Sequence, residues 1–133
     1  MSVCDVLVID DEPVVRAGIR RVLEASGLRV ETADDADSGI GHPAVADCRL
    51  VICDLMLPDR SGAEVLHELV GRRPDLPVIL ITGYATPDLA VRAREAGAAA
   101  FLAKPFEARE LLACVRRALA DRSFTKEEDP WRS

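Results

Sequence analysis

The sequence predicts a single doubly wound α/β domain, a five-stranded parallel sheet with helices on both faces. Strand-like and helix-like patterns alternate five times along the chain. Four of the five strand-like segments contain a short, continuous apolar run, which is typical of a strand buried on both faces. The 133 residues suffice for one domain that buries roughly two-thirds of its unfolded surface.

The first half of the chain predicts two strands and two helices, of which the second helix has the weaker pattern. The first strand covers about 4–9, and a helix follows from Pro13, a residue that suits the first helical position, to a stop at Gly27. One face of that helix is apolar, through Val15, Ile19, Val22 and Leu23. A short second strand covers about 28–32. Between 34 and 47 we expect a short or irregular helix, because the segment contains Gly39, Gly41 and Pro43.

The second half of the chain repeats the alternation more clearly. Strands are predicted at about 49–53, 77–81 and 99–103, and helices at about 61–72, 86–97 and 107–122. Thr86 and Pro87 form a good helix start, because they combine an N-cap residue with proline in the first turn. We therefore expect one domain over 1–122, followed by a polar C-terminal tail or linker stub over 123–133.

Composition excludes several classes of function. The net charge of −6 and the pI of about 4.9 disfavour direct nucleic-acid binding, which needs a basic surface. No apolar run reaches the ~20 residues of a membrane span, and the first residues lack the basic start of a signal peptide, so we expect a cytoplasmic protein without membrane contact. The four cysteines form no C-x-x-C pair, which favours small buried hydrophobic residues over zinc ligands or disulfides.

Polar, chemically capable residues follow four of the predicted strands. Asp10 and Asp11 follow the first strand, Asp54 the third, Thr82 the fourth and Lys104 the fifth. In an open parallel sheet, ligands bind outside the carboxyl ends of the strands, so these groups gather at one edge. Carboxylates suit Mg²⁺, and a lysine can face a phosphoryl oxygen. The set suits in-line phosphoryl transfer, with Asp54 as the best candidate nucleophile and Asp10 and Asp11 better placed to hold the metal.

The same five positions resemble the receiver domain of two-component response regulators. Supporting stretches are 55–62 and 96–98, and the resemblance covers about residues 3–121. The run from Thr82 to Phe106 is similar to receivers of the nitrogen-regulation and nitrogen-fixation type. The resemblance implies a flavodoxin-like, CheY-like fold with strand order 2-1-3-4-5.

The resemblance also implies a role for each site residue. Asp54 would accept a phosphoryl group from a phosphohistidine on a sensor histidine kinase or phosphotransfer protein. The Mg²⁺ cofactor would be held by Asp10 (partly through water), Asp11, Asp54 and the backbone carbonyl of Met56. Lys104 would contact the phosphoryl group, and its bond to Pro105 is expected to be cis.

Two further residues would form a switch. The resemblance implies that Thr82 moves toward the phosphoryl group and vacates space into which the ring of Phe101 turns. Position 101 is Phe rather than Tyr, so a switch there would work by packing, without a hydroxyl hydrogen bond. The face of the fourth helix, fifth strand and fifth helix would then change partners, among them a downstream effector protein, an output domain or a second copy of the chain.

The sequence therefore predicts a signalling switch rather than a metabolic enzyme, with self-phosphorylation and autodephosphorylation as its only reactions. Two alternatives stay open. One is a Mg²⁺-dependent phosphohydrolase with an aspartate nucleophile, which would typically need a D-x-D-type pair near the nucleophile and a cap domain, and the chain shows neither. The other is a degenerate receiver that acts as a binding module, against which the intact set of five residues argues.

Overall fold

The structure is a computed structural model that describes residues 4–120. The predicted tail at 123–133 and the last two residues of the predicted final helix lie outside the described residues. The strands are β1 (Val6–Ile9), β2 (Val30–Ala33), β3 (Leu50–Asp54), β4 (Val78–Thr82) and β5 (Ala100–Ala103). The helices are α1 (Pro13–Ala25), α2 (Ala36–Ile40), α3 (Gly62–Arg72), α4 (Pro87–Glu95) and α5 (Ala108–Ala120), with a 3₁₀ turn at Pro43–Ala46.

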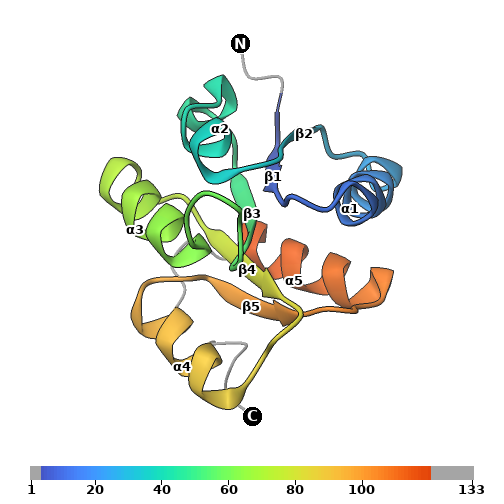
Figure 1. The fold of residues 1–133 in the computed structure, drawn as a ribbon. Helices are drawn as coiled ribbons and strands as arrows, with labels where there is room; N and C mark the ends of the chain where they lie inside the picture. The colour runs from blue at the N-terminus through green and yellow to red at the C-terminus, as the bar shows by residue number, and fades with distance from the viewer. Residues whose placement is uncertain (1–3, 121–133) are drawn as a thin grey trace.

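The five strands form one parallel sheet in the order β2-β1-β3-β4-β5 (Figure 1). The predicted fold class and strand order are thereby confirmed. The chain runs from β1 to the neighbour on one side, β2, and then crosses to the neighbour on the other side, β3. The loops after β1 and β3 consequently diverge and leave a crevice at the carboxyl edge, which is where ligands bind in folds of this kind.

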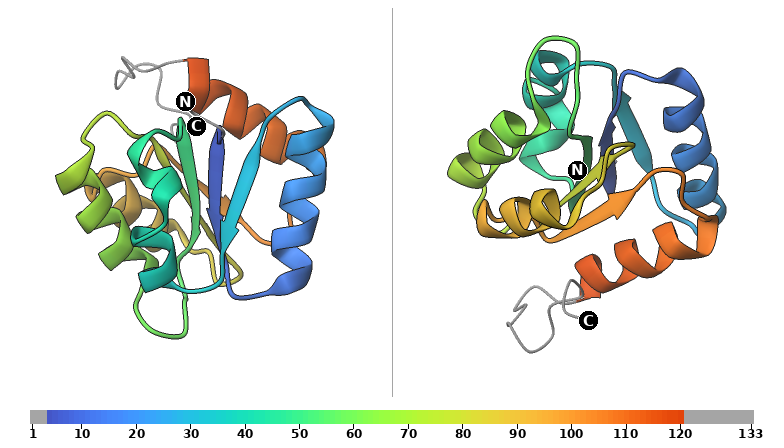
Figure 2. Two further views of the ribbon diagram at one scale, coloured as in Figure 1. Left: turned by 90° about the horizontal axis from the view of Figure 1, so that it is seen from above. Right: turned by 60° about the horizontal axis from the view of Figure 1, so that its bottom comes forward.

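Helices cover both faces of the sheet, as Figure 2 shows. Alternate strand residues point to opposite faces and build two separate apolar cores. One core, with Val8, Ile52 and Ile81, packs under α1 and α5, and the other, with Ile9, Val51 and Leu80, packs under α2, α3 and α4. Among residues 4–120, no helix is long and apolar enough to cross a membrane.

Two glycines end helices as the sequence predicts. Gly27 after α1 has φ +89°, and Gly97 after α4 has φ +105°, a region that residues with a Cβ rarely adopt. The N–H groups of Leu28 and Ala98, each the residue after a glycine, donate back to Leu23 O and Ala93 O. Leu28 therefore belongs to the end of α1, and this is why the second strand begins at Val30 rather than at the predicted 28.

The second helix is short, as its glycines and proline predict. It has five residues, and the 3₁₀ turn that follows starts at Pro43. A carboxylate distant in sequence holds its first turn, because Asp59 accepts the N–H groups of Ala36 (2.9 Å) and Asp37 (3.0 Å). Gly39 lies so close to Ile9 that a Cβ would stand 2.4 Å from Ile9 Cδ1, so a larger residue would force the Ile9 side chain to shift.

Candidate functional site

Two buried carboxylates stand side by side at the carboxyl edge of the central strands. Ile9 and Cys53 are register partners in β1 and β3, so the residues after them, Asp10 and Asp54, share the same position on neighbouring strands. Asp10 is fully buried, and Asp54 is 4% exposed. Buried carboxylates need hydrogen bonds or cationic partners, because burial penalises their charge. The surroundings of this pair therefore determine what the site can do.

Asp10 is only partly satisfied by its neighbours. Its Oδ1 accepts the backbone N–H of Glu12 at 2.8 Å. Its buried Oδ2 lies 3.0 Å from Lys104 Nζ, but no donor among the described residues makes a hydrogen bond to it. Burial raises the pKa of Asp10, although the Glu12 N–H and the Lys104 ammonium act in the opposite direction. Asp10 thus keeps one buried oxygen available for a further cation.

Asp54 is held by one donor on each oxygen. Its Oδ1 accepts the N–H of Met56 at 3.0 Å, and its Oδ2 accepts a hydrogen bond from Lys104 Nζ at 2.8 Å. Gly62 N–H donates to Leu55 O at 2.7 Å and closes the loop between Asp54 and α3. These bonds orient the carboxylate at the mouth of the crevice.

Lys104 reaches the pair from the end of β5. Its N–H donates to Thr82 O at 2.8 Å, and its bond to Pro105 is cis, as predicted. The Lys104 side chain is only 14% exposed. Burial alone would lower its pKa, but hydrogen bonds to Asp54 and Glu12 and the negative charge of Asp10 outweigh burial and raise it. Lys104 is therefore a fixed positive charge at neutral pH.

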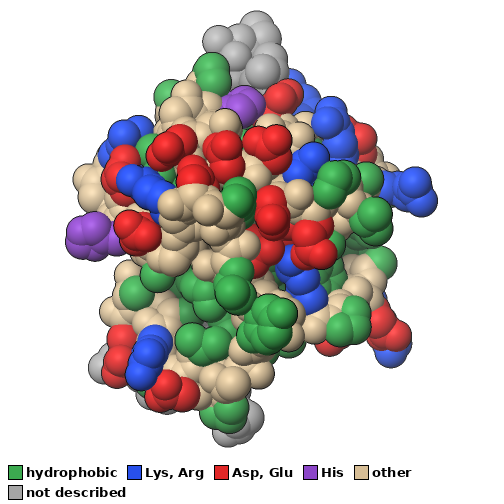
Figure 3. All heavy atoms as spheres, in the orientation of Figure 1, with side chains coloured by type: hydrophobic (Ala, Val, Ile, Leu, Met, Phe, Trp, Pro, Cys, Tyr) green, Lys and Arg blue, Asp and Glu red, His purple; other side chains and the backbone are tan. Residues whose placement is uncertain are grey.

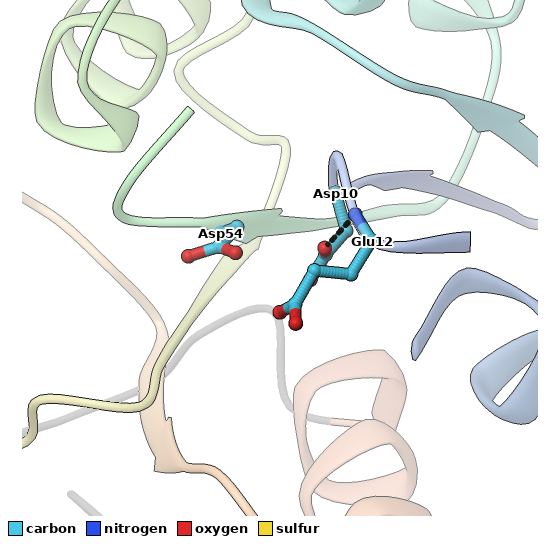
Figure 4. A group of neighbouring side chains, drawn as sticks. All are labelled: Asp10, Glu12 and Asp54. Atoms are coloured by element: carbon cyan, nitrogen blue, oxygen red, sulfur yellow. Dashed lines mark hydrogen bonds between the residues drawn. The ribbon is translucent and has the colours of Figure 1, made fainter. Parts of the chain in front are cut away.

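A third carboxylate, Glu12, lies beside Asp10 and Asp54, and the sequence did not predict it as a site residue. Glu12 Oε1 lies 2.7 Å from Lys104 Nζ, and the side chain of Glu12 is 58% exposed. Figure 4 shows Glu12 beside Asp10 and Asp54. One ligand oxygen from each of the three lies within 4.8 Å of the others. The run of three acids from 10 to 12 was the available signal, but nothing in the sequence shows which acid turns back toward Lys104.

The other predicted site residues border the same cavity. A cavity of about 920 Å³ is lined by Asp11, Met56 and Thr82, together with Asp54 and Lys104. Asp11 is exposed, and Asp10, Glu12 and Asp54 form the close group without it. Met56 is 57% exposed, and an exposed tyrosine, Tyr84, lies on the same cavity wall.

The two predicted switch residues lie on neighbouring strands and on the same face of the sheet. Thr82 ends β4 fully buried, and its Oγ1 accepts the N–H of Tyr84 at 3.1 Å. Phe101 is the register partner of Leu80, two residues before Thr82. Its ring is partly buried against the core under α2, α3 and α4. The ring of Phe101 on β5 and the hydroxyl of Thr82 on β4 therefore lie on the same face of two neighbouring strands.

The charge balance of the site fits a divalent cation. Three carboxylates face one ammonium, and Asp11 adds a further acid at the cavity wall. Figure 3 shows Asp and Glu side chains gathered across the middle of this face, with apolar side chains directly below. Closely spaced carboxylate oxygens and the buried oxygen of Asp10 that lacks a hydrogen bond are suitable ligands for a hard cation such as Mg²⁺.

Comparison with protein families gives one match that covers most of the chain. The family described as the response regulator receiver domain matches residues 6–116. The transcriptional regulator DctD of C4-dicarboxylate transport from Pseudomonas aeruginosa is 43% identical over 126 residues, 92% of this chain and 26% of the relative. The regulator NtrC of Rhizobium meliloti is 34% identical over 121 residues, 91% of this chain and 25% of the relative. The chain thus spans about a quarter of the length of these two curated relatives.

Solved structures agree with the sequence relatives. A CheY-like receiver domain protein from Methanospirillum hungatei superposes with a TM-score of 0.83 at 31% identity, covering 92% of this chain and 98% of that one. NtrX from Brucella abortus, solved with ATP, superposes with a TM-score of 0.83 at 36% identity, covering 94% of this chain and 29% of that one. The predicted likeness to nitrogen-regulation receivers is confirmed by these neighbours.

Proposed function

This chain belongs to the response regulator receiver domain family, and from that premise we propose that Asp54 is its phosphoacceptor. Phosphoryl transfer to an aspartate is the general function of this family in two-component systems. The observation that carries the proposal is the position of Asp54, a buried carboxylate whose oxygens are each held by a donor and which lines an open cavity. The donor would be a phosphohistidine on a sensor histidine kinase or a phosphotransfer protein.

In the proposed reaction, an oxygen of Asp54 attacks phosphorus, an O–P bond forms and the N–P bond to the donor imidazole breaks. The imidazole leaves with the electron pair of that bond and takes up a proton. The residues that would hold Mg²⁺ are Asp10 and Asp54, which belong to the close acidic group, and Asp11 and the backbone carbonyl of Met56, two residues that line the same cavity. When bound, Mg²⁺ would neutralise charge on the phosphoryl oxygens. Lys104 would supply a second, permanent positive charge beside Asp54.

A change in the hydrogen bonds of the Thr82 hydroxyl would couple phosphorylation of Asp54 to the rest of the domain. Thr82 Oγ1 now accepts from Tyr84 N–H and has its own proton to donate, so it can turn toward a phosphoryl oxygen. We propose that this turn lets Phe101 move inward and changes the face formed by α4, β5 and α5. That face would bind an effector protein, an output domain or a second copy of the chain. The product is thus a conformation, and turnover is limited to self-phosphorylation and autodephosphorylation.

Intact mass spectrometry after incubation with acetyl phosphate tests the proposal. We expect the mass to increase by one phosphoryl group only when Mg²⁺ is present, and we expect Asp54→Asn to abolish this gain. Asp88→Asn is the matched control, because it makes the same change at an exposed ion pair with Arg92 on α4, and it should be phosphorylated normally. Multiple turnover of phosphate esters would instead indicate a phosphohydrolase, and no modification would indicate a binding module.

A further inference from the structure

The side chain of Glu12 contacts Lys104 and does not cap the first turn of α1. Glu12 is the N-cap residue of α1, where a side-chain oxygen commonly accepts a hydrogen bond from the first turn. Its side chain makes no such bond, and its Oε1 lies instead 2.7 Å from Lys104 Nζ. This is the shortest of the three contacts between Lys104 Nζ and a carboxylate. Glu12 therefore belongs to the environment of Lys104.

The ammonium of Lys104 is surrounded by three carboxylates, and its hydrogen bonds go to Glu12 and Asp54. An ammonium carries three N–H donors, and Asp10, Glu12 and Asp54 occupy its surroundings at 3.0, 2.7 and 2.8 Å. A phosphoryl group on Asp54 brings new acceptor oxygens, which compete with these carboxylates for Lys104. Asp10 is fully buried and Asp54 carries the phosphoryl group, whereas Glu12 is 58% exposed and can turn into water. Of the three carboxylates, Glu12 is thus the one whose side chain can leave Lys104 most easily.

Glu12 also contributes a negative charge at the entrance of the site. Glu12, Asp11, Asp54 and Lys104 all line the cavity through which a donor must arrive. Small phosphodonors such as acetyl phosphate are anions and are repelled by this charge. Salt screens such repulsion at exposed positions, with a Debye length of about 8 Å at physiological ionic strength. The same charge attracts a divalent cation.

We propose that Glu12 is a positioning residue that holds Lys104 in the resting site and competes with the phosphoryl group for it. The inference rests on the proposed function, because it assumes that Asp54 is phosphorylated. The proposal gives Glu12 opposite effects on the two ligands of the site. Glu12 slows the entry of an anionic donor, and it strengthens the binding of Mg²⁺.

The variant Glu12→Gln tests this, because it removes the charge and keeps the size of the side chain and the backbone N–H that Asp10 accepts. Glu24→Gln is the matched control, since it makes the same change on the same helix at an exposed pair with Arg20. The full chain is used for each. The first measurement is the rate of phosphorylation by acetyl phosphate at saturating Mg²⁺, at low and at high KCl. The second is the dissociation constant of Mg²⁺ by calorimetry, without a phosphodonor.

We expect Glu12→Gln to be phosphorylated roughly two- to fivefold faster than the wild type at low salt, the factor that an exposed ion pair is worth. The gain should shrink at high KCl, and the dissociation constant of Mg²⁺ should rise by a similar factor. Glu24→Gln should match the wild type in every measurement. An unchanged or lower rate in Glu12→Gln overturns the inference, as does a gain that is independent of salt. If the wild type itself is not phosphorylated, the proposed function fails, and the inference fails with it.

Discussion

Gly62 is the residue whose substitution tests the geometry of the site most directly. It is the first residue of α3 and closes the loop that starts at Asp54. A Cβ added at Gly62 would stand 2.4 Å from the carbonyl oxygen of Asp54 and 2.7 Å from Leu55 Cα. These are backbone atoms, so no side-chain rotation can relieve the clash. The variant Gly62→Ala must therefore push the loop away from the end of β3.

The magnitude follows from two opposing contributions to the free energy of unfolding. Overpacking of a buried site costs about 1–3 kcal/mol, and a rigid backbone neighbour favours the upper end of that range. Alanine in a helix regains roughly 0.5–1 kcal/mol relative to glycine. We therefore expect Gly62→Ala to lose about 2 kcal/mol. Gly71 near the end of the same helix has no atom within 4 Å of an added Cβ, so Gly71→Ala should gain about 0.5–1 kcal/mol.

Urea unfolding followed by circular dichroism measures both variants, because a domain of this size is expected to unfold in one cooperative step. Phosphorylation by acetyl phosphate provides a second readout. Gly62→Ala should be phosphorylated more slowly, since the displaced loop carries Met56 and the backbone of Asp54. Gly71→Ala should keep the wild-type rate. Equal free energies of unfolding for the two variants would refute the reasoning, because only the steric environment distinguishes them.

Three further predictions concern stability and reactivity away from the reacting atoms. Ser61→Ala removes the capping box of α3, in which Ser61 and Glu64 exchange hydrogen bonds, and should lower the free energy of urea unfolding by about 1 kcal/mol; an unchanged midpoint would contradict it. The N–H groups of Ala36 and Asp37 keep the pKa of Asp59 below its usual range, so its stabilising contribution is present above about pH 4 and is lost as the pH falls through the lowered folded-state value. The midpoint temperature of thermal unfolding should therefore fall less steeply between pH 7 and pH 3 for Asp59→Asn than for the wild type. Parallel plots of midpoint temperature against pH would exclude this role. Burial raises the pKa of Cys48 to about 11, so iodoacetamide at pH 7 should label this thiol only after unfolding in urea, and mass spectrometry of native protein that shows rapid labelling would be incompatible with the packing.

The fold could be predicted from the sequence because each of its signals is local. Continuous apolar runs mark strands that are covered on both faces, and Gly27 and Gly97 end helices through a backbone conformation that glycine adopts readily. The boundaries that moved were set by hydrogen bonds. Asp54 and Thr82 lie inside β3 and β4, one residue beyond the predicted ends, because ladder pairing continues through them.

The contacts that could not be predicted join residues far apart in the chain. Asp59 holds the start of α2 from 22 and 23 residues away, and no local pattern indicates that pairing. Glu12 and Lys104 are separated by 92 residues. Sequence spacing indicates that acids and a lysine meet at one edge of the sheet. Which acid contacts the lysine depends on how the chain turns into α1, and this becomes visible only in three dimensions.

The arrangement of charges bears on both the stability of the resting site and the proposed reaction. Asp10 and Asp54 are costly to bury, and Lys104 offsets only part of that cost, since three carboxylates share its one charge. Excess negative charge favours a divalent cation and disfavours an anionic donor, so the two ligands of the proposed reaction make opposite demands on the same residues. A purely buried acidic site would satisfy the first demand at the expense of the second. In our proposal the exposed Glu12 serves the first demand, because its charge favours the cation, and opposes the second until its side chain turns away from Lys104.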